Sequence, residues 1–325
     1  MAYKLKNRAS VSADLPAIVQ DKLQTAAKGL SSGAGTDQDR AVHEARKSVK
    51  RARAVLRLLK PVLGGAYATD NATLGELGRQ LSKIRDSAAL LEIFDHLVKK
   101  EGDGADREDM APIRQGLASE KQALASRQST RKTLDRIAHS LSAKTTLTKS
   151  WPALPCDGWQ AIAPGLQRTY RQGRRALRTA AKKHTPDSFH ELRKRVKDHF
   201  FHLDLLTEIL GEATKSRAAE CKDLEQVLGD DHNSVLLQER LRENKKKYAG
   251  RPAVRSLLRL IRSSQRNARG RSLSAAKTLY KAKPSAFVEQ LGKAWNESAA
   301  VTARKPRKPA ASSRTTTPRK KQSAA

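Results

Sequence analysis

The chain has 325 residues, of which 38% are hydrophobic and only 4% aromatic, and its Lys and Arg outnumber Asp and Glu by 65 to 33, for a net charge of +32. This length suits two domains, each long enough to bury a core, and the scarcity of aromatic residues favours helices over sheets. A compact protein with so large a charge repels itself, so the composition favours a polyanionic partner.

Two classes of protein are excluded by composition. Cys156 and Cys221 are isolated, so the chain has neither a disulfide framework nor a four-cysteine zinc site, and a reducing compartment is expected. No apolar run approaches the ~18 residues of a membrane span. We therefore expect a cytoplasmic protein with no membrane partner.

The first half of the chain reads as four helices. Apolar spacing predicts helices over 13–28, from about residue 36 to an end within 61–65, and over 74–100, and a long charged helix that starts near Pro112 and ends around Leu141. Four helices joined by short loops are the ingredients of an antiparallel bundle.

The composition changes over 143–164, which contains several Thr and Pro residues and Gly158, and we place a domain boundary there. Beyond it, Thr185-Pro186-Asp187 reads as the cap and first turn of a helix, and further helices are predicted over 166–183, 212–247, 252–283 and 287–295. The expected fold is all-α, with one four-helix bundle in residues 1–150 and a second in 151–297.

Residues 298–325 contain no acid and nothing large to bury, and they are rich in Ala, Ser, Thr and Pro. Their cations are Arg304, Lys305, Arg307, Lys308, Arg314, Arg319, Lys320 and Lys321. Such a composition predicts a disordered basic tail.

A stretch of the first half recurs in the second. Residues 41–64 return as 188–211, always 147 positions later. The shared residues include His43/His190, Glu44/Glu191, Arg46/Arg193, Lys47/Lys194, Lys50/Lys197, Leu56/Leu203, Leu63/Leu210 and Gly64/Gly211. One register held over so many positions indicates an internal duplication.

Each copy predicts an amphipathic helix with cations beside its buried seam. In the first copy the seam residues recur at spacings of three and four, and the cations follow the same spacing about 100° around the helix. The first basic row consists of His43, Arg46, Lys47, Lys50, Arg53 and Arg57, and the second basic row of His190, Arg193, Lys194 and Lys197. Solvated surface helices usually mix signs to gain ion pairs. Rows with so few acids therefore indicate an anion-binding surface.

The duplicated H-x-x-R-K-x-x-K, the opening AYKLK (Ala2–Lys6), Leu228-Gly229 and TYRQGRRAL (Thr169–Leu177) together resemble the CHAD family, the conserved-histidine α-helical domain, over roughly residues 2–296. The resemblance implies two four-helix bundles related by a pseudo-twofold axis, with a basic inner surface that binds inorganic polyphosphate. It also implies association with polyphosphate granules, and we expect no cofactor and no metal.

The resemblance also implies which side chains contact the ligand. Carried over by motif, they are His43, Arg46, Lys47, Lys50, Arg53, Arg57, Arg171, Arg174, His190, Arg193, Lys194, Lys197 and His202. The chain departs from the family where Phe200-Phe201 follows the second row, so Arg53 has no counterpart and the first half is expected to carry more of the contact. Asp86 is expected to orient an arginine of a row.

The expected activity is binding without catalysis, and two alternatives stay open. Nucleic-acid binding, as by a nucleoid-associated protein, fits the charge, and the tail would add a weak contact. A metal-dependent phosphohydrolase is suggested by His43-Glu44 and His190-Glu191, yet a lysine replaces the second histidine of H-E-x-x-H in both copies. The E-x-E-x-K signature of the catalytic domain that accompanies many family members is absent from the sequence.

Overall fold

The computed structural model describes residues 3–32, 37–101, 104–244 and 252–304, and in these ranges the chain is helical without any strand, which confirms the predicted all-α class. The helices are α1 (Val11–Ser32), α2 (Gln38–Glu101), α3 (Gly104–Ser126), α4 (Gln128–Ala143), the 3-10 helix η1 (Lys144–Ser150), α5 (Gly158–Lys183), α6 (Pro186–Leu210), α7 (Glu212–Glu243), α9 (Pro252–Leu279) and α10 (Pro284–Arg304).

Helix α2 contains both the second and the third predicted helices, joined at a kink. Gly64 interrupts the helical backbone with φ 52° and ψ −125°, and Gly211 turns the chain from α6 into α7 with φ 51° and ψ −130°. Positive φ favours glycine, which has no Cβ to clash. The repeated sequence therefore makes the same turn twice, and the helix after the first turn starts at once rather than at Leu74.

The long fourth helix expected from Pro112 to Leu141 is in fact two helices, α3 and α4, which break at the extended residue Arg127. The reason lies in the packing. Ile113 of α3 is buried in a small apolar cluster with α7 and α9, whereas Ile137 of α4 is buried in the main cluster with α1. A straight helix could not serve both clusters.

Both apolar clusters draw on residues from either side of the expected boundary at 150 and 151. The main cluster joins α1, α2 and α4 to α5, α6, α7, α10 and the end of α9, and the small one joins the far end of α2 and α3 to α7 and the start of α9. At Gly165 of α5, a Cβ would lie 1.8 Å from the Leu58 carbonyl oxygen of α2, so only glycine permits this crossing. The division into two bundles related by a pseudo-twofold axis stays a prediction.

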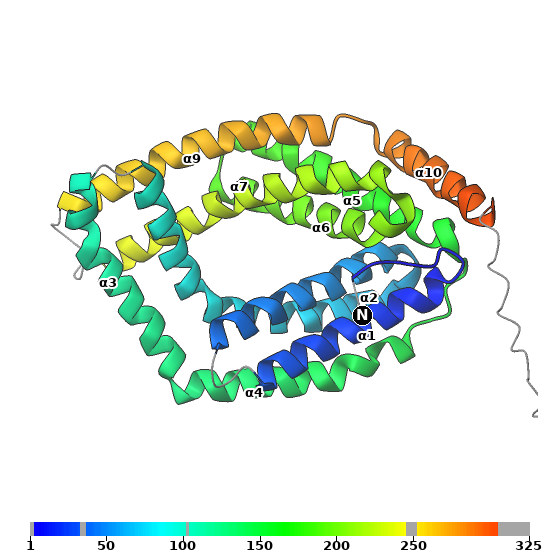
Figure 1. Cartoon of the computed structure of the whole chain (residues 1–325), viewed down its shortest axis with the longest axis horizontal. Helices are drawn as coiled ribbons and strands as arrows, with labels where there is room; N and C mark the ends of the chain where they lie inside the picture. The colour runs from blue at the N-terminus through cyan, green and yellow to red at the C-terminus, as the bar shows by residue number, and fades with distance from the viewer. Residues whose placement is uncertain (1–2, 33–36, 102–103, 245–251, 305–325) are drawn as a thin grey trace, which may run out of the picture.

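Figure 1 shows how the helices are arranged: α9 runs along one edge of the molecule and α1 with α4 along the opposite edge, while α3 and the far part of α2 connect the two at one end. Helix α10 continues to Arg304, past the predicted end at Trp295, so the disordered tail predicted for 298–325 is wrong over 298–304, which are helical; the rest of that tail, 305–325, lies outside the described residues. Within the described ranges, no helix combines the length and the apolarity needed to cross a bilayer.

Candidate functional site

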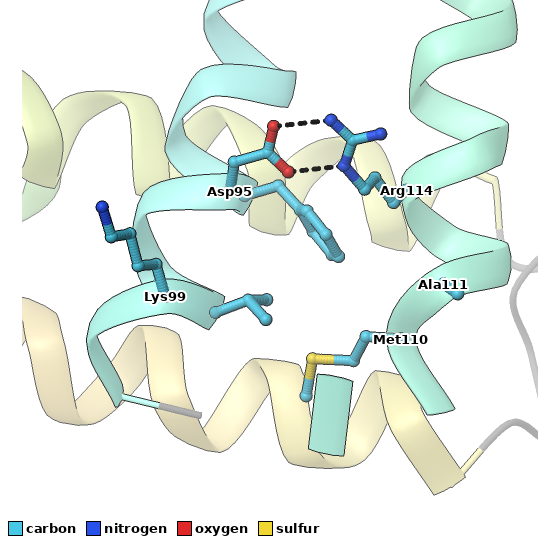
Figure 2. A pocket seen from close by; sticks show the side chains of 7 residues that line it. Asp95, Lys99, Met110, Ala111 and Arg114 are labelled. Carbon is cyan, nitrogen blue, oxygen red and sulfur yellow. Dashed lines mark hydrogen bonds and ion pairs between the residues drawn. The ribbon is translucent and has the colours of Figure 1, made fainter. Parts of the chain in front are cut away.

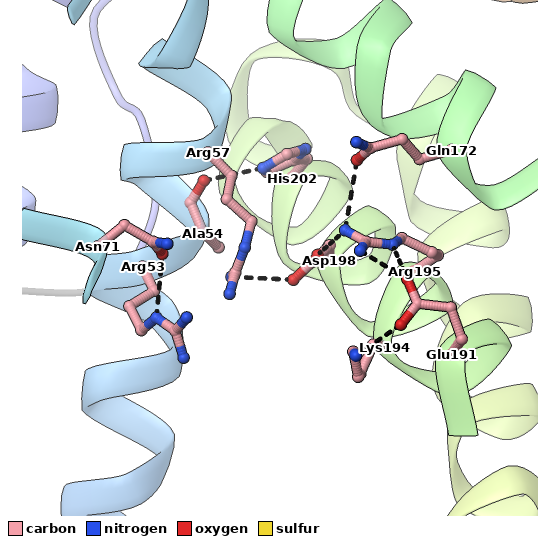
Figure 3. Close-up of polar contacts among 10 residues, drawn as sticks. All are labelled: Arg53, Ala54, Arg57, Asn71, Gln172, Glu191, Lys194, Arg195, Asp198 and His202. Atoms are coloured by element: carbon pink, nitrogen blue, oxygen red, sulfur yellow. Dashed lines mark hydrogen bonds and ion pairs between the residues drawn. The ribbon is translucent and has the colours of Figure 1, made fainter. Parts of the chain in front are cut away.

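Helices α2 and α6 carry the two basic rows and are fastened to each other directly. Their seams are buried, as predicted, and the Thr185 hydroxyl caps α6 by accepting from the Ser188 backbone N–H at 3.3 Å. Between the helices, Arg57 Nη1 donates to Asp198 Oδ1 at 3.0 Å, and His202 Nε2 donates to the Ala54 carbonyl oxygen at 2.9 Å (Figure 3). These bonds hold the two rows in a fixed relation.

Four cations meet at the middle of this arrangement: Arg46 and Lys50 of the first row, and Arg193 and Lys197 of the second. Burial lowers the pKa of the Lys50 ammonium well below its ordinary value, and the charges of Lys197, Arg46 and Arg193 lower it further. Burial likewise lowers the pKa of Arg46, with Arg193 adding to the effect. Like charges held this close in a partly buried place favour a bound anion.

The carboxylates near these cations are distributed unequally. Glu225 of α7 accepts from Lys197 Nζ at 2.7 Å and lies 3.0 Å from Arg193 Nη2. In the described part of the chain, neither Arg46 nor Lys50 makes an ion pair. Asp86, expected to orient an arginine, attracts Arg46 without pairing with it, and burial raises the pKa of the Asp86 carboxyl despite that attraction.

Several buried side-chain nitrogen atoms of the site have no hydrogen-bond partner among the described residues. The atoms concerned are Nε of Arg46, Nε of Arg193, Nη1 of Arg85 and Nδ1 of His190. A buried polar group without a partner costs about 1–3 kcal/mol, and more when it is charged. An acceptor supplied by a ligand would remove this cost.

The histidines of the motif differ in exposure. The His43 side chain is 56% exposed, whereas His190 is half-buried and packs against His232 of α7, with ring centroids 4.1 Å apart and the ring planes tilted by 40°. Burial lowers the pKa of both motif histidines, helped by Arg85 at His43 and by Arg193 at His190. In the free protein both surroundings therefore favour the neutral form of the ring.

The other expected contact residues lie at the margins of this centre. Lys47 and Lys194 pair with the glutamates of their own helices, at 3.5 and 2.5 Å, and Arg53 donates to Asn71 Oδ1 at 3.1 Å. His202 is fully buried, which makes it a connection between the helices and keeps it from the surface that the rows share.

On α5, Arg171 is exposed and Arg174 half-buried, and no interaction in the described structure links either to the rows. Helix α5 contacts α6 outside the second row, through Gln172, whose Oε1 accepts from Arg195 Nη1 at 3.3 Å (Figure 3).

Three members of the site were not among the sequence candidates: Arg85, His232 and Glu225. The repeat could have indicated the first two, since they stand 147 positions apart, as the two motif histidines do. Nothing in the repeat could indicate Glu225, because Gly78 stands at the corresponding position of the first copy.

A pocket of about 280 Å³ lies away from the rows, between the far part of α2 and α3. Phe94, Val98 and Met110 line it, and Asp95 binds Arg114 across it with an Oδ1–Nε distance of 2.7 Å (Figure 2). Its arginine is already neutralised, so this pocket does not resemble an anion site. Among the described residues, no group of three His, Cys, Asp or Glu is placed to hold a metal ion.

Comparisons with known proteins match the part of the chain that carries the two basic rows. The sequence profile of the CHAD domain matches residues 17–242. Among solved structures, the chain is similar to the crystal structure of the CHAD domain from the plant Ricinus communis, with a TM-score of 0.56 and 17% identity, covering 89% of this chain and 94% of that one. At this identity the structural likeness concerns the fold alone. No curated protein sequence matches the chain.

Proposed function

The chain belongs to the CHAD domain family, and from this premise we propose that it binds inorganic polyphosphate, without cleaving it, on the surface formed by the two basic rows. One observation carries the proposal. Arg46 and Arg193 each have a buried Nε–H group without a partner among the described residues, in a place where the positive charges of four side chains act on one another.

Phosphate oxygens suit these donors in geometry and in charge. Arginine holds two oxygens of a phosphate through parallel N–H bonds, and lysine contributes a point charge. A bound phosphate would raise the lowered pKa of Lys50 towards its ordinary value and offset the repulsion within the site. The positioning of the donors therefore favours an anion that offers many acceptor oxygens.

The length of the rows favours a linear polymer over a single phosphate ion. From His43 to Arg57 the first row extends about 21 Å along its helix, at 1.5 Å per residue. One orthophosphate would reach only one or two of these side chains. Polyphosphate has a charge on every repeat and no bases to read, so its binding requires closely spaced cations on rigid supports, which the two rows supply together.

Binding without catalysis is part of the proposal. The zinc motif that His43-Glu44 and His190-Glu191 begin is interrupted by Lys47 and Lys194 in the two copies. Both lysines pair with the adjacent motif glutamates, which engages these carboxylates away from any metal.

Titration calorimetry with polyphosphate of defined chain length tests the proposal, with orthophosphate at equal total phosphate as the comparison. We expect saturable binding of the polymer only. Equal heats from orthophosphate, or none from polyphosphate, would show that the rows are not a polyphosphate site. A release assay with added magnesium should detect no orthophosphate, and release that the substitution His190→Ala abolishes would contradict the absence of catalysis.

Association with polyphosphate granules belongs to the same proposal. In cells stained for polyphosphate, a fluorescent fusion of the whole chain should coincide with the stained bodies, and the variant R46Q/K50Q should not. A variant that still reaches the bodies would place the targeting information outside the rows.

A further inference from the structure

Helix α9 carries a second concentration of positive charge. Its 28 residues include six arginines and Lys277 but no acid. Arg255, Arg259, Arg262 and Arg266 are all exposed, and at 100° per residue they fall within about 60° of one another. We call these four residues the arginine stripe. It is about 16 Å long at 1.5 Å per residue.

The charges of the stripe are not neutralised by neighbouring helices. Arg269, the next arginine along α9, pairs with Asp231 at 2.9 Å and is not counted in the stripe. Arg259 donates to Ser256 Oγ at 3.0 Å and Arg262 to the Leu258 carbonyl oxygen at 3.2 Å, both neutral acceptors. Among the described residues, no carboxylate forms an ion pair with any of the four arginines.

The opposite face of α9 fixes the helix in place. Ala253, Leu257 and Ile261 are buried in the small apolar cluster, against the far part of α2, α3 and α7. Figure 1 shows α9 along one edge of the molecule, outside α6 and the first part of α2, which carry the basic rows. The stripe is therefore a rigid, outward-facing line of cations, separate from the proposed polyphosphate site.

We propose that the arginine stripe binds duplex DNA through its phosphate backbone, independently of base sequence. A single line of cations on a convex helix has no facing row, so a flexible polyanion would lose much conformational freedom there for few contacts. A duplex avoids this cost, because it is stiff over about 50 nm and holds its phosphates in a fixed array.

The composition of α9 favours the duplex over single strands. The helix contains no aromatic side chain on which an unpaired base would stack. Ser263 and Asn267 are exposed beside the stripe and can donate to phosphate oxygens, as such side chains do in protein–DNA interfaces. Arginine forks supply the charged contacts.

The test compares two variants of the full chain that lose the same charge at different places. One replaces the stripe: R255Q, R259Q, R262Q and R266Q. The control, R175Q, R178Q, K182Q and K183Q, replaces four exposed cations of α5. Fluorescence anisotropy with a duplex of about 20 base pairs is measured between about 50 and 200 mM salt, and thermal unfolding shows whether both variants fold.

We expect the stripe variant to lose about 100-fold in DNA affinity and its salt slope to fall by about 3 to 4, since each phosphate contact contributes about 0.9 to the slope. The DNA affinity of the control should stay within about 3-fold of that of the natural chain. This small loss is expected from its lower net charge. Saturating DNA should leave polyphosphate binding intact, as should the stripe substitutions.

Three outcomes would overturn the proposal. Equal losses in both variants would mean that only net charge matters. Unchanged DNA affinity in the stripe variant would place DNA binding elsewhere on the chain. Loss of polyphosphate binding in a folded stripe variant would make the stripe a part of the polyphosphate surface. A natural chain that binds DNA but no polyphosphate would refute the proposed function and leave this inference standing.

Discussion

The two basic rows share one sequence pattern, yet they differ in their ion pairs with neighbouring carboxylates. Arg193 and Lys197 of the second row share Glu225, at 3.0 and 2.7 Å. Arg46 and Lys50, at the matching positions of the first row, form no ion pair within the described structure. The difference traces to one position of the repeat, which is Glu225 in α7 and Gly78 in α2.

This comparison teaches that two helices with the same sequence pattern need not form the same site. The charge that a row presents to a ligand depends on what the neighbouring helix contributes. Glu225 partly neutralises Arg193 and Lys197 before any ligand arrives, whereas Arg46 and Lys50 form no ion pair among the described residues. We therefore expect the first row to contribute more to polyphosphate binding.

The largest effect is expected from R46Q/K50Q. Contacts between charged side chains and phosphates each contribute about 1.5–3 kcal/mol, so losing two should weaken polyphosphate binding by about 100-fold or more. The matched variant R193Q/K197Q should lose only about 10-fold, because Glu225 already opposes those charges. Calorimetry on both variants, with thermal unfolding as the check on folding, measures the difference. Equal losses of affinity in the two variants would show that the two rows contribute equally to polyphosphate binding.

A second difference between the copies concerns His202, whose position in the first copy is held by Val55. Burial lowers the pKa of His202 to about 4, although its bond to the Ala54 carbonyl and the charge of Asp198 raise it. The unfolded chain, with a histidine pKa near ~6.5, binds the proton first as the pH falls. Stability from this group is complete above about pH 6.5 and is lost progressively down to pH 4.

We expect this loss to be about 2–3 kcal/mol between pH 7 and pH 4.5, from the same two pKa values. Urea unfolding of the natural chain and of His202→Gln at both pH values measures it, since glutamine keeps a donor for Ala54 but does not titrate. The variant should be less sensitive to acid by that amount. Identical pH dependence in the two proteins would mean that His202 is not held neutral by the fold.

The substitution Glu225→Gln should make the second row resemble the first. Without the carboxylate, Arg193 and Lys197 become available to phosphate, and we expect polyphosphate affinity to rise about 10-fold, or about 1.4 kcal/mol. The free protein should unfold at a lower temperature, because two cations lose their partner. Glu191→Gln is the control, since its partners Lys194 and Arg195 lie at the margin of the site. Weaker binding in E225Q would indicate that Glu225 positions the cations rather than opposing the ligand.

Much of the fold could be predicted from the sequence, because apolar residues recur at helical spacing in most of its helices. The seam of α2, the cap at Thr185 and the turn at Gly64 all follow from local rules about spacing and φ. The break at Arg127 could not be predicted, because it depends on which cluster each of α3 and α4 joins. Packing between distant segments decides such features.

The candidate site likewise has features that the sequence predicts and features that depend on packing. The basic rows were visible because charge at helical spacing is a local pattern. The sequence could not show that His202 would be buried against Ala54, that Arg171 would point to solvent, or that Glu225 would pair with two cations. Each of these depends on which helix lies beside which, and on contacts between residues far apart in the chain.

The smallest effect on polyphosphate affinity is expected from substituting the two motif histidines. Its size should differ between His43 of the first row and His190 of the second. Burial and nearby arginines keep the pKa of His43 and of His190 below the ordinary value in the free protein. A bound polyphosphate would raise both, so the complex takes up protons and affinity should rise a few-fold as the pH falls from about 8 to 6. His190 is more buried than His43, so H190A should remove more of this dependence than H43A, and the double variant should bind equally at both pH values. Titrations at each pH measure the slopes, and a double variant with the slope of the natural chain would assign the proton uptake to other groups.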